Sequence, residues 1–182
     1  MKIFMSICTG RGKDGVTDLL FGKRLDKADQ RFEVMGSLDE LNAHIGVVRC
    51  GNVSESIKEI LSKLQGLLVS LMGELATLPE NQDQYDEKGY SRLTEEDRQW
   101  VLALIKEGES GENPIKFRGW AMPGAAGQQD AAHMDVCRTI CRRAERQFWK
   151  WDTEAQYTLG KQFLNNLSDL FWILAREGEK SQ

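Results

Sequence analysis

The sequence predicts an all-α fold, a bundle of five helices that carries an extended, glycine-rich N-terminal loop. Apolar residues recur at i, i+3, i+4 and i+7 through most of the chain, which is the spacing of one face of a helix. No segment shows the sustained alternation of apolar and polar residues that an exposed sheet strand requires. The chain has no internal repeat, so residues 1–182 are expected to form a single domain.

The first two helices are predicted from caps and apolar stripes. Ser37 and Glu40 fit a capping box, so the first helix is expected over residues 38–49, with Gly51 ending it. The second helix is expected to begin near Ser54 and to end before the proline at position 79. Its apolar stripe consists of Ile57, Ile60, Leu61, Leu64, Leu67, Leu68, Leu71, Met72 and Leu75.

Three more helices are expected in the second half of the chain. The third begins with an acidic first turn after Thr94, which favours a helix N-terminus. Apolar stripes predict the fourth helix over residues 128–150 and the fifth over residues 156–176. Residues 79–93 are polar and rich in turn formers, so we expect a loop between the second and third helices.

Composition excludes several classes of function. The chain is 41% hydrophobic and 29% charged with a net charge of −4, whereas a nucleic-acid-binding domain is normally strongly basic. No apolar run approaches the about 20 residues that cross a bilayer, so no membrane partner is expected. The apolar run at the start is too short for a secretory signal, and a cytoplasmic location is therefore expected.

The cysteine pattern does not indicate a disulfide framework, because such frameworks belong to small secreted chains. The four cysteines are Cys8, Cys50, Cys137 and Cys141. Cys137 and Cys141 lie four residues apart and could form half of a metal site, but only His44 and His133 are available to complete it. We expect reduced thiols that pack in the helices.

A glycine-rich stretch, TGRGKDGVTDLLFG, opens the expected loop of residues 8–31. Glycines allow backbone amides to point into one concavity, and hydroxyl and ammonium groups beside them would add donors for a polyphosphate. The residues concerned are Thr9, Gly10, Gly12, Lys13, Gly15 and Thr17. The stretch matches neither a Walker A loop nor, without a preceding strand, a dinucleotide fingerprint. A flexible tail without a ligand remains the alternative at this point.

A second cationic feature is CRTICRRAER, residues 137–146, on a helix that is expected to pack in the core. One side of that helix carries Arg138, Arg142, Glu145 and Arg146. Like charges at i and i+4 destabilise a helix by a few tenths of a kcal/mol, so an anion should offset Arg138 and Arg142. Three candidates remain open: Glu145, Asp39 of the first helix, or an exogenous polyphosphate such as a nucleoside triphosphate.

Three stretches in this order resemble the PduO-type ATP:cob(I)alamin adenosyltransferases. They are TGRGKDGVTDLLFGKRLDKADQRFEVMGSLDELNAHIGVVR, CRTICRRAER and FLNNLSDLFWILAR. The resemblance covers about residues 9–49 and 119–176. It implies a five-helix bundle assembled as a homotrimer, with active sites at subunit interfaces. It also implies transfer of the 5′-deoxyadenosyl group of ATP to the cobalt of a reduced corrinoid such as cobalamin, with Mg2+ and release of triphosphate.

The resemblance also implies roles for individual residues. It places the ATP loop at Thr9, Gly10, Gly12, Lys13, Gly15 and Thr17, with Lys27 reaching the phosphates. Asp39 would pair with Arg138 beside the nucleotide. Arg142 would contact the triphosphate, and Glu145 would lie near it. Asn165 would lie near ATP, and Trp120 would replace a family aromatic that closes over the lower face of the corrin ring.

This sequence departs from the family pattern at several positions. Lys13 stands where the family loop TGDxGxT has its acid, and Asn166 replaces the arginine of LNRLSD. Asp135 occupies the position of the family's LHxAR histidine, with His133 two residues earlier. An alternative function is therefore a trimeric nucleotide- and adenosylcobalamin-binding protein that delivers the cofactor to an acceptor enzyme with weak or no turnover.

Overall fold

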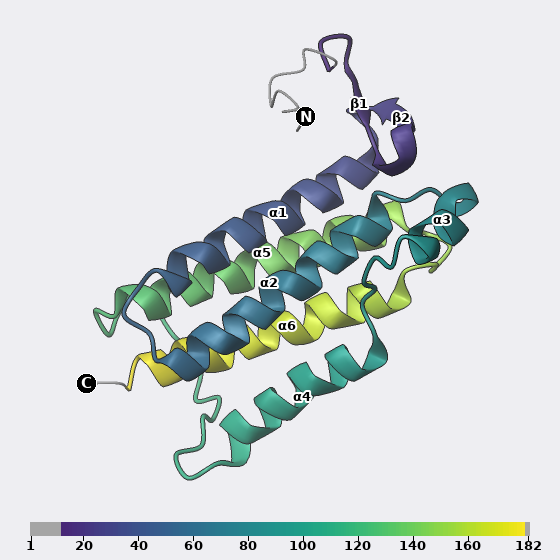
Figure 1. Cartoon of the computed structure of the whole chain (residues 1–182). Coiled ribbons are helices and arrows are strands. Elements are labelled where there is room, and N and C mark those ends of the chain that lie inside the picture. Colours follow the sequence, from purple (N-terminus) through teal and green to yellow (C-terminus); the bar gives the residue numbers. More distant parts are fainter. Residues whose placement is uncertain (1–11, 181–182) are drawn as a thin grey trace, which may run out of the picture.

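The structure, a computed structural model, describes residues 12–180 and is mainly helical, as the sequence predicts (Figure 1). Thr9 and Gly10 of the predicted ATP loop, together with Cys8, lie outside the described residues. Six α-helices are found between residues 12 and 180, one more than expected. They are α1 (Gln30–Arg49), α2 (Glu55–Leu75), α3 (Gln82–Glu87), α4 (Glu95–Ser110), α5 (Gln129–Trp151) and α6 (Thr158–Gly178).

Helices α5 and α6 form the centre of the bundle. Helix α5 packs against both α1 and α6, α1 packs against α2, and α4 lies on the outer side of α6 (Figure 1). The core of the bundle is almost entirely aliphatic and aromatic. Cys137 and Cys141 are fully buried in it, as expected for packing residues. Burial raises the pKa of the Cys137 thiol to about 12 and that of Cys141 well above its usual range.

Helix α1 begins eight residues before the predicted start, so the predicted capping box is wrong. Asp29 caps the helix, and its side chain accepts a hydrogen bond from the amide of Arg31 at 2.9 Å. Ser37 is buried inside the helix, where its hydroxyl donates to Gln147 of α5. Val34, one helical turn earlier, is fully buried, and this apolar contact extends the helix toward its N-terminus.

The N-terminal segment contains a small hairpin that the sequence did not indicate. Strands β1 (Val16–Asp18) and β2 (Arg24–Asp26) pair antiparallel and are joined by a short 3-10 turn over Leu20–Gly22. Three-residue strands are too short to show a clear alternation of apolar and polar residues, which explains the wrong expectation of a loop without strands. The hairpin lies at the end of the bundle where α1 begins (Figure 1), and the amide of Leu20 donates to the carbonyl of Ala76 at the end of α2 at 3.1 Å.

Residues 79–93 are also more ordered than predicted, because they include the 3-10 helix η2 (Pro79–Asn81) and α3. Arg92 ties this segment together, since its guanidinium pairs with Asp86 at 2.8 Å and donates to Gln82 at 2.8 Å. The predicted start of α4 is confirmed. Thr94 and Asp97 form a capping box in which each side chain bonds to the other's backbone amide.

Gly108 sets the distance between α4 and α6. A Cβ atom at Gly108 would lie 2.3 Å from the Cγ2 atom of Ile173, so only glycine allows this close approach. The contact fixes the end of α4 beside the C-terminal part of α6. Among residues 12–180, no helix combines the length and the apolar character that a bilayer-spanning segment needs.

Candidate functional site

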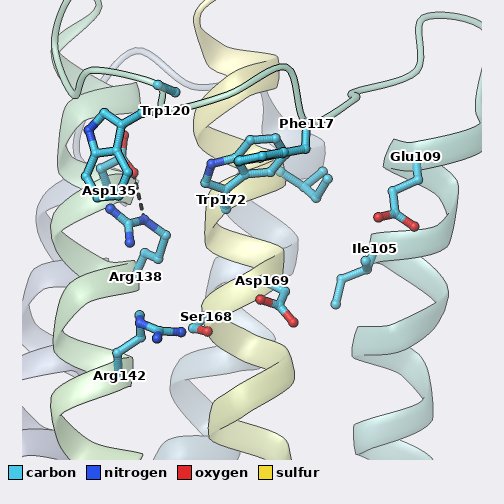
Figure 2. Close-up of a pocket in the computed structure, with 12 residues that line it drawn as sticks. Ile105, Glu109, Phe117, Trp120, Asp135, Arg138, Arg142, Ser168, Asp169 and Trp172 are labelled. Carbon is cyan, nitrogen blue, oxygen red and sulfur yellow. Dashed lines mark hydrogen bonds and ion pairs between the residues drawn. The ribbon is translucent and has the colours of Figure 1, made fainter.

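The main candidate site is a pocket between α4, α5, α6 and the loop of residues 115–121 (Figure 2). We call it the main pocket. Its volume is about 550 Å³, within the range of small-molecule sites in proteins. Its walls consist of Ile105, Glu109, Phe117, Trp120, Ala121, Asp135, Arg138, Arg142, Ser168, Asp169, Trp172 and Ile173.

Three aromatic side chains cover one end of the main pocket (Figure 2). Phe117 lies over Trp172 of α6, with ring centroids 6.1 Å apart and planes tilted by 45°. Trp120 extends over the end of α5 that carries Asp135 and Arg138. Phe117 is 75% exposed and Trp120 is 84% exposed. Large apolar side chains are rarely left this open, and such exposure marks a surface that covers a ligand or partner.

Within this chain, Arg138 is held by a partner on its own helix, and its predicted pairing with Asp39 is not formed among residues 12–180. The Nε atom of Arg138 lies 2.8 Å from the carboxylate of Asp135, one turn earlier on α5. The second oxygen of Asp135 accepts from Arg176 of α6 at 2.5 Å. Asp39 is exposed on α1 and forms no ion pair with any residue that the structure describes. The i, i+3 spacing explains this result, because Asp135 reaches Arg138 without any tertiary packing.

Arg142 lies one turn after Arg138 and also lines the main pocket. No ion pair of Arg142 is found within residues 12–180, so its charge is available to a ligand. Asp169 of α6 faces the same space (Figure 2). Burial raises the pKa of Asp169, and the nearby positive charge of Arg142 opposes that effect. Sequence reasoning did not select Asp169, although it lies four residues after Asn165 in the quoted motif.

Glu145 does not neutralise Arg142, because no ion pair joins the two within the described residues. Instead, Glu145 accepts a hydrogen bond from the side-chain amide of Asn165 at 3.4 Å, which links α5 to α6. Neither residue lines the main pocket. Arg143 points to a different side of α5 and forms an ion pair with Glu40 of α1.

The glycine-rich segment forms its own small structure. The ammonium of Lys27 donates to the carbonyl of Gly12 at 2.7 Å, and its backbone amide donates to the carbonyl of Gly15 at 2.8 Å. Gly15 has φ = +74°, a conformation that favours glycine. Lys13 is exposed, and Thr17 lies in β1. The segment is thus folded around Lys27.

The structure does not bring this segment to the main pocket of the same chain. Arg31, at the start of α1, lies over the ring of Trp151 at the end of α5, 4.8 Å from its centroid. Arg142 lies nine residues before Trp151, or about 14 Å along the helix axis. The hairpin and the loop that covers the main pocket lie at opposite ends of the bundle (Figure 1).

The main pocket suits a ligand with two different parts. Its aromatic end favours a flat, weakly polar surface, because such surfaces pack against indole and phenyl rings. Arg138 and Arg142 favour phosphate oxygens, which guanidinium groups bind through two parallel hydrogen bonds. No cluster of three or more metal-ligating side chains is found within residues 12–180. The protein side of the site therefore offers cations and aromatic rings.

Comparison with known proteins agrees with this arrangement. A family model described as cobalamin adenosyltransferase matches residues 7–177. A cobalamin adenosyltransferase of Cupriavidus metallidurans is 33% identical over 174 residues, which cover 93% of this chain and 86% of the relative. A corrinoid adenosyltransferase of Citrobacter freundii is 32% identical over 175 residues, covering 93% of each.

A solved structure gives the same result for the fold. It is a variant of the PduO-type ATP:corrinoid adenosyltransferase of Lactobacillus reuteri, complexed with cobalamin and ATP. The two chains superpose with a TM-score of 0.81 at 29% identity, covering 94% of this chain and 92% of the other. The family model spans nearly the whole chain, and the chain therefore belongs to the cobalamin adenosyltransferase family.

Proposed function

We propose that this protein transfers the 5′-deoxyadenosyl group of ATP to the cobalt of a reduced corrinoid, cob(I)alamin, and releases triphosphate. The observation that carries the proposal is the main pocket, in which one wall of arginines faces an aromatic end. Family membership and the relatives' activity on corrinoids support it. Residues 1–182 act as one domain in this proposal, with the ATP loop at about residues 8–31.

The proposed chemistry needs positioning and charge stabilisation. The lone pair of Co(I) attacks C5′ of ATP, a Co–C bond forms, and the C5′–O bond breaks with its electrons leaving on triphosphate. Co(I) is a strong nucleophile and requires no general base. Arg142, whose guanidinium has no ion pair among residues 12–180, stabilises the negative charge on the leaving triphosphate. Arg138, fixed by Asp135, adds a second cation 4 residues earlier on the same helix.

The aromatic end of the pocket has a role in accepting the corrinoid. Trp120, Phe117 and Trp172 present apolar surface to the corrin face and offer no ligand to cobalt. An apolar wall beneath cobalt excludes water and a lower axial ligand, which makes Co(II) easier to reduce to Co(I). Trp120 is thus the proposed counterpart of the family aromatic that closes over the lower face of the corrin ring.

Mg2+ enters this proposal with ATP. The residues that the structure describes contain no cluster of carboxylates suited to hold the ion by themselves. Magnesium in nucleotide sites is commonly bound through substrate phosphates, water and one or two carboxylates. We therefore assign the protein no resident Mg2+ site and treat MgATP as the co-substrate.

A complete site requires a second copy of the chain in this proposal. The Gly12–Lys27 segment lies at the end of the bundle where α1 begins, away from the main pocket of its own chain (Figure 1). A homotrimer would place the loop residues of one copy beside Arg138 and Arg142 of the next. The loop residues are Thr9, Gly10, Gly12, Lys13, Gly15, Thr17 and Lys27. Asp39, Glu145 and Asn165 would then lie around the nucleotide rather than in the corrinoid pocket.

The reaction also suggests the cellular context. ATP is abundant in the cytoplasm, so we place the enzyme there. The adenosylcobalamin product serves enzymes that start radical reactions from its Co–C bond, and one such enzyme is the proposed acceptor.

An anaerobic assay tests this function. The protein is mixed with MgATP and chemically reduced cob(I)alamin, and the absorbance change from cob(I)alamin to adenosylcobalamin is followed together with triphosphate release. We expect conversion with one triphosphate for each adenosylcobalamin. ATP binding without any spectral conversion would overturn the enzyme proposal and favour the alternative, a cofactor-delivery protein.

A further inference from the structure

A second cavity adjoins the main pocket and differs from it in charge. It lies between the loop of residues 114–121 and the C-terminal end of α6, and its volume is about 390 Å³. Trp120, Ala121 and Trp172 line both cavities, so the two share one aromatic wall. We call it the cationic pocket and define it by Lys116, Arg118, Trp120, Trp172, Arg176 and Lys180.

The charge of this cavity contrasts with that of the whole chain. Four of its lining side chains are cationic and one, Glu179, is anionic, whereas the chain as a whole has a net charge of −4. Lys116 and Arg118 are exposed on the loop, and no ion pair of either is found within residues 12–180. Glu179 is already engaged by Arg176 at 2.9 Å. The cavity therefore attracts an anion.

Arg176 provides the strongest indication of a ligand. It is only 8% exposed, and its Nη2 atom serves both Asp135 at 2.5 Å and Glu179 at 2.9 Å. Its Nε and Nη1 atoms are buried and have no hydrogen-bond partner among residues 12–180. Buried donors without acceptors are rare, because each one costs free energy when it leaves water. An oxygen-rich group that enters the cationic pocket would supply the missing acceptors after a small adjustment of the loop.

We propose that the cationic pocket binds the phosphodiester in the nucleotide tail of the corrinoid. This inference rests on the proposed function, which places the corrin macrocycle in the main pocket against the shared wall of Trp120 and Trp172. Cobalamin carries its phosphodiester on a flexible chain at the edge of the macrocycle, so the phosphate can cross this wall. Arg138 and Arg142 remain on the far side of Trp120 for the triphosphate of ATP.

The pocket would make the enzyme selective for complete corrinoids. Cobinamide has the same macrocycle but lacks the phosphate and the base, and cobinamide phosphate restores the phosphate alone. The wild-type chain should therefore bind cob(II)alamin and cob(II)inamide phosphate more tightly than cob(II)inamide. Added salt should weaken the binding of cob(II)alamin and cob(II)inamide phosphate more than that of cob(II)inamide, because salt screens exposed charges.

The test variant is Lys116→Gln/Arg118→Gln, which removes two exposed cations and leaves the buried Arg176 in place. The matched control is Lys88→Gln/Lys106→Gln, which removes two exposed cations that line neither cavity. Dissociation constants for the three cob(II) corrinoids are measured anaerobically by spectral titration with MgATP present. We expect the test variant to bind the two phosphorylated corrinoids about 3- to 10-fold more weakly than the wild type and to bind cobinamide with an unchanged dissociation constant.

Four results would overturn the inference. Equal weakening of all three corrinoids would mean that the loop cations serve the macrocycle or the fold. Cobinamide phosphate that behaves like cobinamide would mean that the base is recognised instead of the phosphate. In the third result, inorganic triphosphate competes with cobalamin and binds the test variant more weakly than the wild type. That result would mean that the cationic pocket binds a free polyphosphate and not the phosphodiester of the corrinoid. Wild-type protein that binds none of the corrinoids would refute the proposed function itself.

Discussion

Two buried ion pairs connect α5 and α6, and they differ in how completely their hydrogen bonds are satisfied. At the turn between the helices, Lys161 is 1% exposed and contacts both the carboxylate of Asp152 at 2.8 Å and its carbonyl at 2.7 Å. The amides of Gln156 and Tyr157 donate to the same carboxylate. At the pocket end, Asp135 joins Arg138 and Arg176, and two nitrogens of Arg176 have no hydrogen-bond partner in the part of the chain that the structure describes.

The difference separates a structural pair from a functional one. Burial raises the pKa of Asp152, but the hydrogen bonds from Lys161 and the two amides outweigh burial, so the net pKa is lowered. That carboxylate stays charged and its network is closed. The network around Asp135 borders two cavities and keeps unused donors. Polar groups without partners are typical of ligand-binding sites. We therefore expect substitutions at the pocket end to affect turnover or KM, and substitutions at the Asp152 end to affect stability.

The largest effect is expected at Arg142. Arg142→Ala should lower turnover about 100- to 1000-fold, because it removes a cation that stabilises the departing triphosphate. The midpoint of thermal unfolding should change little, since Arg142 is exposed and has no ion pair in the described part of the chain. The anaerobic adenosylation assay gives turnover, and Arg143→Ala serves as the matched control on the same helix. Equal turnover in both variants would place the triphosphate elsewhere.

Asp152→Ala should lower the stability of the fold and leave turnover unchanged. It leaves the buried ammonium of Lys161 without a counter-ion, so the free energy of unfolding should fall by about 3–5 kcal/mol. Urea unfolding measures the loss, and Lys161→Met gives the other arm of a double-mutant cycle. Turnover per folded molecule should stay near the wild-type value. A variant of normal stability with impaired turnover would reverse the roles assigned to the two ends.

Asp135→Asn should affect both measurements moderately. The amide retains one acceptor, but Arg176 loses a charged partner, and the expected loss of stability is about 1–3 kcal/mol. Arg138 also loses its anchor, so KM for ATP should rise several-fold. Asp152→Asn provides the comparison, because it should leave KM unchanged. An unchanged KM in Asp135→Asn would limit Asp135 to a structural role like that of Asp152.

The smallest effect is expected at a contact between two histidines, one on α1 and one on α5. The Nε2 atom of His44 lies 3.1 Å from the Nδ1 atom of His133. Burial lowers the pKa of His44, and repulsion from His133 adds to the effect. The unfolded chain then binds more protons than the native one below about pH 6.5, so stability should fall as the pH drops toward the lowered native pKa. Urea unfolding between pH 7.5 and 5.5 should show this fall, and His44→Gln should reduce it. An unchanged pH dependence in that variant would contradict the assignment.

Local signals in the sequence predicted the helices well where side chains act on their own backbone. The capping box at Thr94 and the apolar stripes of α2, α5 and α6 are such signals. The start of α1 was misplaced because the Ser37–Glu40 pattern imitates a cap. The buried contact of Val34 extends the helix beyond it, and a contact of that kind depends on tertiary packing.

The site was only partly predictable for the same reason. Arg138 and Arg142, selected from the sequence, and Trp120, selected through the family resemblance, all line the main pocket. The contact of Arg138 within the chain was not foreseen, although Asp135 stands three residues before it. Arg176 and Asp169 were missed because their importance depends on what lies across from α6. No local sequence pattern predicts which residues face α6 across the two cavities.

The most direct test is a crystal structure of the protein with MgATP and cob(II)alamin bound. We predict that the corrin ring lies in the main pocket against Trp120 and Trp172 and that Arg142 contacts the triphosphate. A structure with both ligands bound away from α5 and α6, and with the main pocket unused, would contradict the proposed site.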